Sequence, residues 1–247
     1  MPKSSVDYAT DNITVYRFCQ YQCRYCWAWR VPVLRSRIER GRYDPVAEAR
    51  RYLRRSGRVI VVSFTADPYP WVELEERRTR EVLSVLAENP DNRVLVLTKN
   101  PVIALRDVDV MVKHGDMWLG TTLTTLDEVS ASAWEPKAPA PLLRVRALER
   151  AKEEGVRTWV SIEPITPGVT YPETIIEETV EFVDWYVLGS LNYVKQLKLL
   201  YRESDLREWY RKHVIKALKL LSELGKPYFI KKELRKIIEP FAKKYIC

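Results

Sequence analysis

The sequence of 247 residues has no uninterrupted apolar run of about 18 or more residues, which a membrane-spanning helix requires. Its amino terminus, MPKSSVDYATDN, also lacks the basic and then apolar pattern of a secretory signal. The chain contains no linker, internal repeat or low-complexity tract. We therefore expect a single domain over residues 1–247 that is cytoplasmic and does not associate with membranes.

Histidine, glutamine and asparagine are scarce, with two, three and five residues respectively. So few amide side chains, beside 41 Lys and Arg and 33 Asp and Glu, are typical of thermophile proteins. The net charge of +8 favours an acidic partner over a basic one. Hydrophobic residues still make up 46% of the chain, which is enough for a substantial core and excludes a disordered or fibrous protein.

Six short apolar segments rich in β-branched residues predict strands, because each segment ends in a small or polar residue. They span residues 13–18, 59–65, 93–98, 118–123, 157–162 and 185–188. Proline marks helix starts between them at Pro45, Pro101 and Pro172. Such an alternation predicts a parallel sheet, either open and doubly wound or closed into a full or partial barrel. Active sites of these folds lie at the carboxyl ends of the strands.

The chain continues beyond the sixth predicted strand. Residues 203–224 have the pattern of an amphipathic helix, and residues 227–230 predict one further strand. A basic helix follows at the end of the chain. The core is therefore expected over about residues 11–192, with a helical and strand extension over residues 193–247.

Three of the four cysteines, Cys19, Cys23 and Cys26, form a C-x3-C-x2-C motif directly after the first predicted strand. Tetrahedral zinc usually takes four ligands, and no fourth Cys or His lies nearby in the sequence. An ordinary 4Fe-4S cluster takes one thiolate per iron, so three thiolates leave one iron open to a substrate or cofactor. Two alternatives remain: small buried residues, or a structural zinc site completed from afar. Cys247, the last residue, is a free terminal thiol or takes part in a disulfide or subunit contact.

The motif, with the aromatic Tyr25 before its last cysteine and six βα units around it, resembles the radical S-adenosylmethionine (radical SAM) enzymes over roughly residues 11–192. The segments SFTADPYP, VLTKNP and GTTLTTLD at successive strand ends resemble the spore photoproduct lyase-like branch. The resemblance implies a partial (β/α)6 TIM-type barrel. It also implies that the open iron binds the amino and carboxylate groups of S-adenosylmethionine. One electron would then cleave this cofactor to methionine and a 5'-deoxyadenosyl radical, which abstracts hydrogen from a substrate.

The resemblance assigns residues at the other strand ends to S-adenosylmethionine. Its amino group would meet Ser63, Thr65 or Asp67, where the family often has Gly-Gly-Glu. Lys99 would pair with its carboxylate, and the alternative is a solvated loop lysine. Hydroxyl, carboxylate and amide groups at the later strand ends suit ribose and adenine, although the two serines fit helix caps equally well. With Tyr25, these candidates are Thr121, Thr122, Ser161, Glu163, Gly189, Ser190 and Asn192.

Basic charge is concentrated in residues 30–58, with a net charge of +7, and in residues 226–244, with +5. Arginines interleaved with Trp27, Trp29, Tyr43 and Tyr52 predict contacts to phosphates and stacked bases. The alternative is a solvated face of a thermophile protein whose aromatic rings turn into the core. Four arginines would share one side of the helix after Pro45: Arg50, Arg51, Arg54 and Arg55.

The sequence thus predicts a radical SAM enzyme of lyase or transferase type, with an electron donor as partner and nucleic acid as the favoured substrate. The hydrogen-donor cysteine of spore photoproduct-type lyases has no counterpart, because no Cys lies between Cys26 and Cys247. The rival interpretation is a non-catalytic protein that binds nucleic acid and is stabilised by an iron-sulfur or zinc site.

Overall fold

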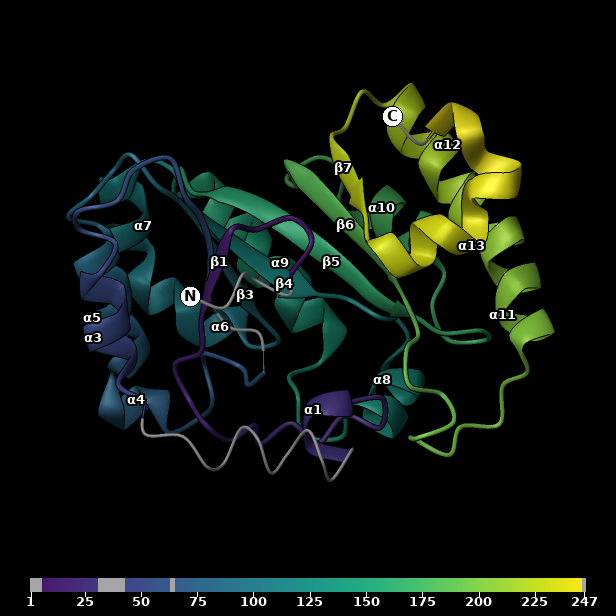
Figure 1. Cartoon of the computed structure of the whole chain (residues 1–247), viewed down its shortest axis with the longest axis horizontal. Coiled ribbons are helices and arrows are strands. Elements are labelled where there is room, and N and C mark those ends of the chain that lie inside the picture. Colours follow the sequence, from purple (N-terminus) through teal and green to yellow (C-terminus); the bar gives the residue numbers. More distant parts are fainter. Residues whose placement is uncertain (1–5, 31–42, 63–64, 246–247) are drawn as a thin grey trace.

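The computed structural model describes residues 6–30, 43–62 and 65–245, and in them seven parallel strands form one sheet in the order β1 to β7. Each strand lies beside its successor in the sequence, so every crossover falls on the same side. The sheet therefore curls, with its helices on the convex face, into a partial TIM-type barrel (Figure 1). The strands are β1 Asp11–Ile13, β2 Val59–Val62, β3 Arg93–Thr98, β4 Met117–Thr122, β5 Arg157–Ile165, β6 Trp185–Ser190 and β7 Tyr228–Ile230.

Helices separate the strands (Figure 1). The helices that begin at Pro45 and Pro101 are short, and further turns follow each of them. Pro45, Pro101 and Pro172 each begin a helix, as predicted, and Asp44 accepts hydrogen bonds from the first free amides of its helix. None of the helices in the described part is both long and apolar enough to cross a membrane. Before β5 they are α1 Trp27–Arg30, α3 Pro45–Arg50, α4 Glu73–Glu76, α5 Arg78–Leu86, α6 Pro101–Ala104, η1 Leu105–Asp107, α7 Val108–His114, α8 Glu128–Trp134 and α9 Pro141–Glu153. After β5 they are α10 Pro172–Thr179, α11 Glu203–Trp209, η2 Tyr210–Val214, α12 Ile215–Glu223, α13 Lys232–Ala242 and η3 Lys243–Tyr245.

The strand predictions are confirmed except at the first strand and at the end of the second, where β2 ends at Val62 and residues 63–64 lie outside the described residues. Residues 93–98 match β3 to the residue, and the predicted helix over residues 203–224 corresponds to α11, a π-helical turn and α12. The prediction of a strand over residues 13–18 is wrong, because β1 ends at Ile13. Its ladder with β2 ends there, since Ile13 pairs with Val62, the last residue of β2. The next residues are thereby released into the loop that carries the cysteines.

The two faces of the sheet are buried against different partners. Side chains of alternate residues, such as Val94 and Val96 of β3, pack with the helices in the main core. The residue between them, Leu95, points into the curl and joins a second, smaller core with Trp159 of β5. This explains why the strands are apolar on both faces and yet leave room inside the curl.

Aromatic side chains close the amino-terminal half of the curl. The Trp159 and Trp185 rings lie 5.3 Å apart, and the Tyr8 ring contacts both edge-on at 5.8 and 5.4 Å. Gly120 of β4 is required there, because a Cβ at this residue would lie 2.3 Å from the Trp159 indole. We call these residues, with Trp118 and Phe229, the aromatic plug. It leaves the carboxyl half of the curl as the space available for a site.

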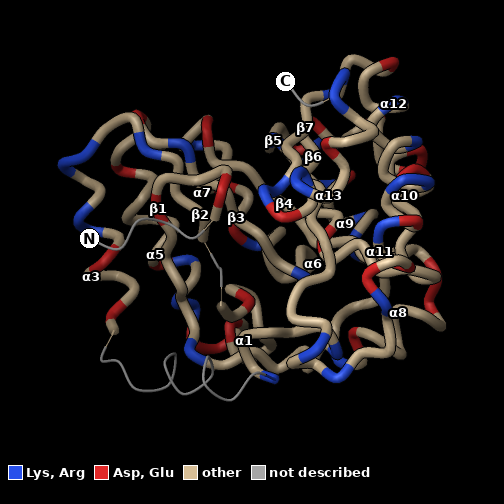
Figure 2. Tube along the Cα trace, turned by 45° about the vertical axis from the view of Figure 1, so that its right-hand side comes forward, with Lys and Arg blue, Asp and Glu red and all other residues tan. Residues whose placement is uncertain are grey.

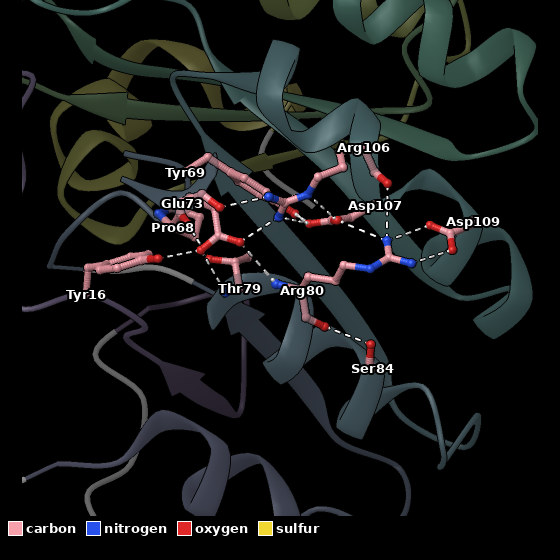
Figure 3. A network of polar contacts seen from close by, with 10 residues as sticks. All are labelled: Tyr16, Pro68, Tyr69, Glu73, Thr79, Arg80, Ser84, Arg106, Asp107 and Asp109. Atoms are coloured by element: carbon pink, nitrogen blue, oxygen red, sulfur yellow. Dashed lines mark hydrogen bonds and ion pairs between the residues drawn. The ribbon is translucent and has the colours of Figure 1, made fainter. Parts of the chain in front are cut away.

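A buried polar network holds the segment before the cysteines against the helices after β2 (Figure 3). The carboxylate of Glu73, fully buried, accepts a hydrogen bond from the Tyr16 hydroxyl at 2.5 Å and pairs with Arg106 at 2.6 Å. Arg106 also pairs with buried Asp107, which accepts a hydrogen bond from the Tyr69 hydroxyl. A buried carboxylate with several donors is fully compensated, so the network braces these segments.

The aromatic plug gives a direct stability prediction. We expect Gly120→Ala to lower the free energy of unfolding by about 3 kcal/mol, at the upper end of the usual cost of overpacking, because the buried indole has little room to move. Denaturant unfolding followed by circular dichroism measures the change. The same substitution should cost much less in a Trp159→Leu background, which has no indole. An equal cost in both backgrounds would show that the plug is not packed in this way.

Candidate functional site

A cavity of about 630 Å³ opens at the carboxyl ends of the strands, on the side of the curl that the aromatic plug leaves free. Segments from one end of the chain to the other line it, from Tyr8 near the amino terminus to Lys231 after β7. Most residues that the sequence predicts for a site lie in its wall. They are Cys19, Cys23, Tyr25, Cys26, Thr65, Asp67, Lys99, Thr122, Ser161, Glu163, Ser190 and Asn192.

The three cysteines lie on a loop that the backbone holds in place. The amide of Cys26 donates to the carbonyl of Cys23 at 3.1 Å, and α1 begins at the next residue. The Arg30 side chain donates to the same Cys23 carbonyl at 2.9 Å. The Trp29 indole donates to the carbonyl of Thr65 at 3.2 Å, which ties the loop to the segment after β2. The spacing of the motif therefore makes a compact turn whose thiols face one cavity.

Burial raises the pKa of all three thiols, that of Cys19 to about 11 and that of Cys23 to about 12. Backbone amides oppose this at Cys19 and Cys26, and the ammonium of Lys99 opposes it at Cys23 and Cys26. Thiols of this kind become thiolates when a cationic metal centre replaces their protons. The backbone amides and the Lys99 ammonium around the cysteines stabilise the negative charge of the thiolates.

The residues fit an iron-sulfur cluster better than a single metal ion. Among the described residues, no three His, Cys, Asp or Glu side chains are spaced to hold one ion. A 4Fe-4S cluster needs a wider spacing, because each thiolate binds a different iron. The described residues contain no fourth cysteine, and Cys247 lies outside them. The three thiols therefore suit a cluster with one iron free of protein ligands.

Asp67 holds the ends of β2 and β3 together. Its carboxylate accepts hydrogen bonds from the Thr98 hydroxyl at 2.6 Å, the Lys99 amide at 2.7 Å and the Tyr69 amide at 2.9 Å. Its own backbone amide donates to the Cys19 sulfur. Asp67 thus orders both the cysteine loop and Lys99, while Ser63 lies outside the described residues.

Lys99 follows β3, and its side chain is only 14% exposed. Its ammonium lies 5.4 Å from the centre of the Tyr25 ring and 3.9 Å from a carboxylate oxygen of Glu135. Burial acts to lower the pKa of Lys99, but Cys23 and Glu135 outweigh it and hold the pKa above its usual value. The cavity wall therefore carries a fixed positive charge close to the cysteines, which excludes the solvated loop lysine as a description of Lys99.

The structure does not bring two of the predicted residues into the cavity. Thr121 is buried, and its hydroxyl donates to the carbonyl of Thr98 at 2.7 Å. Gly120 faces the inside of the curl, so the alternation of a strand turns Thr121 outward and Thr122 inward. Gly189 lies below the cavity wall, where a Cβ would meet the Glu163 carboxylate at 2.7 Å. The absence of a side chain at Gly189 leaves room for the Glu163 carboxylate.

Several residues of the site were missed by the sequence analysis. Lys231 follows β7, and its ammonium pairs with Glu163 at 2.7 Å inside the cavity. Tyr193 also lines the cavity, and its ring centre lies 6.0 Å from that of Trp27, which the sequence had already indicated as a residue for stacking on bases. Lys231 could have been found, because the rule that polar residues follow strand ends applies to the seventh predicted strand as well. The ring of Tyr193 carries no such signal.

The arginines from Arg50 to Arg58 lie at the opposite end of the sheet from the cavity, because they precede the amino end of β2. Helix α3 ends at Arg50, and the turn after it leads into the amino end of β2. The prediction that Arg50, Arg51, Arg54 and Arg55 share one side of a helix is therefore wrong. The ring of Tyr52 turns into the core, and Arg51 pairs with Glu48, as the alternative of a solvated face expects. Residues 31–42 of the basic segment 30–58 lie outside the described residues.

Comparison with known proteins agrees with the resemblance seen in the sequence. Residues 13–183 match the family model of the radical SAM superfamily. An uncharacterised protein of Methanocaldococcus jannaschii is 30% identical over 185 residues, which are 73% of this chain and 70% of that protein. An uncharacterised protein of Acidianus two-tailed virus is 28% identical over 194 residues, which are 75% of this chain and 62% of that one.

Solved structures share the fold at low sequence identity. Streptococcus suis SuiB bound to its precursor peptide SuiA superposes with a TM-score of 0.68 at 13% identity, over 93% of this chain. This chain spans 51% of the SuiB chain, about half its length. A spore photoproduct lyase variant with bound AdoMet and a dinucleoside spore photoproduct superposes with a TM-score of 0.59 at 16% identity. That match covers 97% of this chain and 75% of the lyase.

Proposed function

We propose, since the chain belongs to the radical SAM superfamily, that it reductively cleaves S-adenosylmethionine in the cavity at the carboxyl ends of the strands and abstracts hydrogen from a substrate bound there. When bound, the 4Fe-4S cluster supplies the electron that splits the cofactor into methionine and a 5'-deoxyadenosyl radical. The observation that carries the proposal is the loop whose three cysteines, one buried and two partly buried, face this cavity.

The chain's own residues bind and orient the cofactor. Cys19, Cys23 and Cys26 would hold three irons of the cluster, and the ammonium of Lys99 would pair with the carboxylate of the methionyl group. Such a pair is strong in a site from which the ligand displaces water. Thr65 or Asp67 would meet the amino group. The ribose and adenine lie against the polar groups of the later strand ends, which are Thr122, Ser161, Glu163, Ser190 and Asn192.

The basic charge of two segments next to the cavity supports an anionic substrate. Residues 14–30 and 191–202, which both contribute to the cavity wall, carry six Lys and Arg and no Asp or Glu. Figure 2 shows basic segments along the edge of the molecule next to α1. Together with the rings of Trp27 and Tyr193, these cations suit a single nucleic-acid strand. The bound dinucleoside of the lyase neighbour favours the same class, whereas the SuiA peptide of the other neighbour makes a peptide the alternative.

The first prediction concerns the three cysteines. The anaerobically reconstituted protein, given S-adenosylmethionine and dithionite, should release 5'-deoxyadenosine, and Ala at Cys19, Cys23 or Cys26 should abolish the release, because each thiolate is needed to hold the cluster. Cys247→Ala is the matched control and should retain it. Uptake of zinc without iron would instead indicate a non-catalytic protein.

The second prediction concerns Lys99. Loss of its charged hydrogen bond in Lys99→Ala should cost about 1.5–3 kcal/mol and lower the affinity for S-adenosylmethionine by about 10- to 150-fold, with the iron content unchanged. Equilibrium binding to the reconstituted protein measures the affinity. The control is Lys113→Ala, an exposed lysine at the end of α7. Equal affinities of the two variants would rule out this role of Lys99.

The third prediction locates the nucleic-acid surface. Affinity for a fluorescent single-stranded oligonucleotide should fall linearly with salt on logarithmic axes, because bound phosphates release counterions. A triple variant in which Gln replaces the exposed residues Arg24, Lys195 and Lys198 of the two basic segments next to the cavity should have a slope that is flatter by about 2 units if each contacts a phosphate.

The matched control replaces Arg50, Arg51 and Arg54 at the far end of the sheet and should leave the slope unchanged. A slope that changes only in this control set would contradict the proposed surface. No binding at low salt, in a protein that still cleaves S-adenosylmethionine, would favour a peptide or a small metabolite.

A further inference from the structure

A buried group of charges lies directly behind the cysteine loop and has no part in the contacts proposed so far. Its centre is Glu135, which follows α8 and whose side chain is 1% exposed. One carboxylate oxygen pairs with Arg144 of α9 at 2.5 Å, and Arg144 is as deeply buried. The other accepts hydrogen bonds from the hydroxyls of Tyr25 and Thr124. Three kinds of donor thus converge on one carboxylate.

The group is joined to the cysteine loop at several points. Tyr25 lies between Cys23 and Cys26, so its bond to Glu135 fixes the middle of the motif. The Tyr25 ring also stacks on that of Trp134, and the amide of Arg24 donates to the carbonyl of Trp134 at 2.8 Å. The loop is therefore fastened to the end of α8 by backbone, ring and carboxylate together.

Glu135 also contributes to the electrostatic potential at the cysteines. Its carboxylate lies 3.9 Å from the ammonium of Lys99 and acts on Cys23 as a nearby negative charge. Burial acts to raise the pKa of Glu135, but Arg144 and Lys99 outweigh it and keep the pKa below its usual value, so the group is ionised. A charge in such a buried place is poorly screened and acts over a longer distance than one at the surface.

We propose that Glu135 is a positioning residue that holds Tyr25 and Lys99 against the cysteine loop and, through its negative charge, sets how readily the cluster accepts an electron. The inference rests on the proposed function, because it requires a cluster on the three cysteines. Reduction adds negative charge to a cluster, and neighbouring charges and hydrogen bonds are among the factors that set its potential. An ionised carboxylate close to Cys23 opposes this step, and a hydrogen bond to that carboxylate weakens the opposition.

Two substitutions should therefore change the potential in opposite directions. Glu135→Gln keeps the shape and removes the charge, so reduction of the cluster should become easier, by about tenfold in the equilibrium constant or about 59 mV. Tyr25→Phe keeps the charge and removes one donor to it, so reduction should become harder by a smaller factor. Redox titration of the reconstituted protein, followed by the electron paramagnetic resonance of the reduced cluster, measures both.

Glu73→Gln is a closely matched control. Glu73 is also a buried carboxylate that accepts a hydrogen bond from a tyrosine and pairs with an arginine, and it does not line the cavity. Glu73→Gln should lower the free energy of unfolding, as we also expect for Glu135→Gln, but should leave the reduction potential of the cluster unchanged. Equal potentials in wild type, Glu135→Gln and Tyr25→Phe would overturn the inference, and so would a shift of the same sign in both.

The test separates this inference from the proposed function. If the wild-type protein assembles no cluster, the proposed function itself is contradicted. If it assembles a cluster and cleaves S-adenosylmethionine, but the potential does not respond to Glu135, only the inference fails. Should Glu135→Gln not fold, a lowered potential in Tyr25→Phe supports the inference and an unchanged one contradicts it.

Discussion

The packing of the Trp159 indole over Gly120 decides where the cavity of this protein lies. A curled parallel sheet has an inner face that must be filled, and aromatic rings fill only its amino-terminal half. The polar residues that follow the strands therefore line a cavity at the carboxyl half, where the cysteine loop also lies. The packing of Trp159 against Gly120 thus separates an apolar, closely packed half of the curl from a half with a polar cavity.

The charged groups at the cavity are also held in fixed positions by hydrogen bonds and ion pairs. Asp67 orders the loop after β2 and the backbone of Lys99, and Glu135 orders Tyr25 and the Lys99 ammonium. Each carboxylate has several donors, so the cost of burying it is offset. The cavity consequently presents the Lys99 ammonium and three thiols in a preorganised setting, which suits a charged cofactor with a carboxylate.

Much of this follows from the sequence, because it depends on local rules. Buried strands, proline at helix starts and the cysteine spacing are all visible in short segments, and β3 was predicted to the residue. The choice between Thr121 and Thr122 needed one further fact, the inward direction of Gly120, which only the packing of Trp159 reveals. Glu135 and Arg144 give no local signal at all, since their burial and pairing arise from contacts between distant parts of the chain. The position of Arg50, Arg51, Arg54 and Arg55, away from the cavity, could not be predicted for a related reason. Composition shows that a segment is basic, but not at which end of the sheet it lies.

Three thiolates would leave one iron of the cluster open, and S-adenosylmethionine would bind this iron in the cavity. The most direct measurement is electron-nuclear double resonance of the reduced, reconstituted protein with S-adenosylmethionine carrying nitrogen-15 in its amino group. We expect a coupling between the cluster and this nitrogen in the wild-type protein, and no such coupling without the cofactor. A cluster that shows no coupling to the bound cofactor would contradict this expectation.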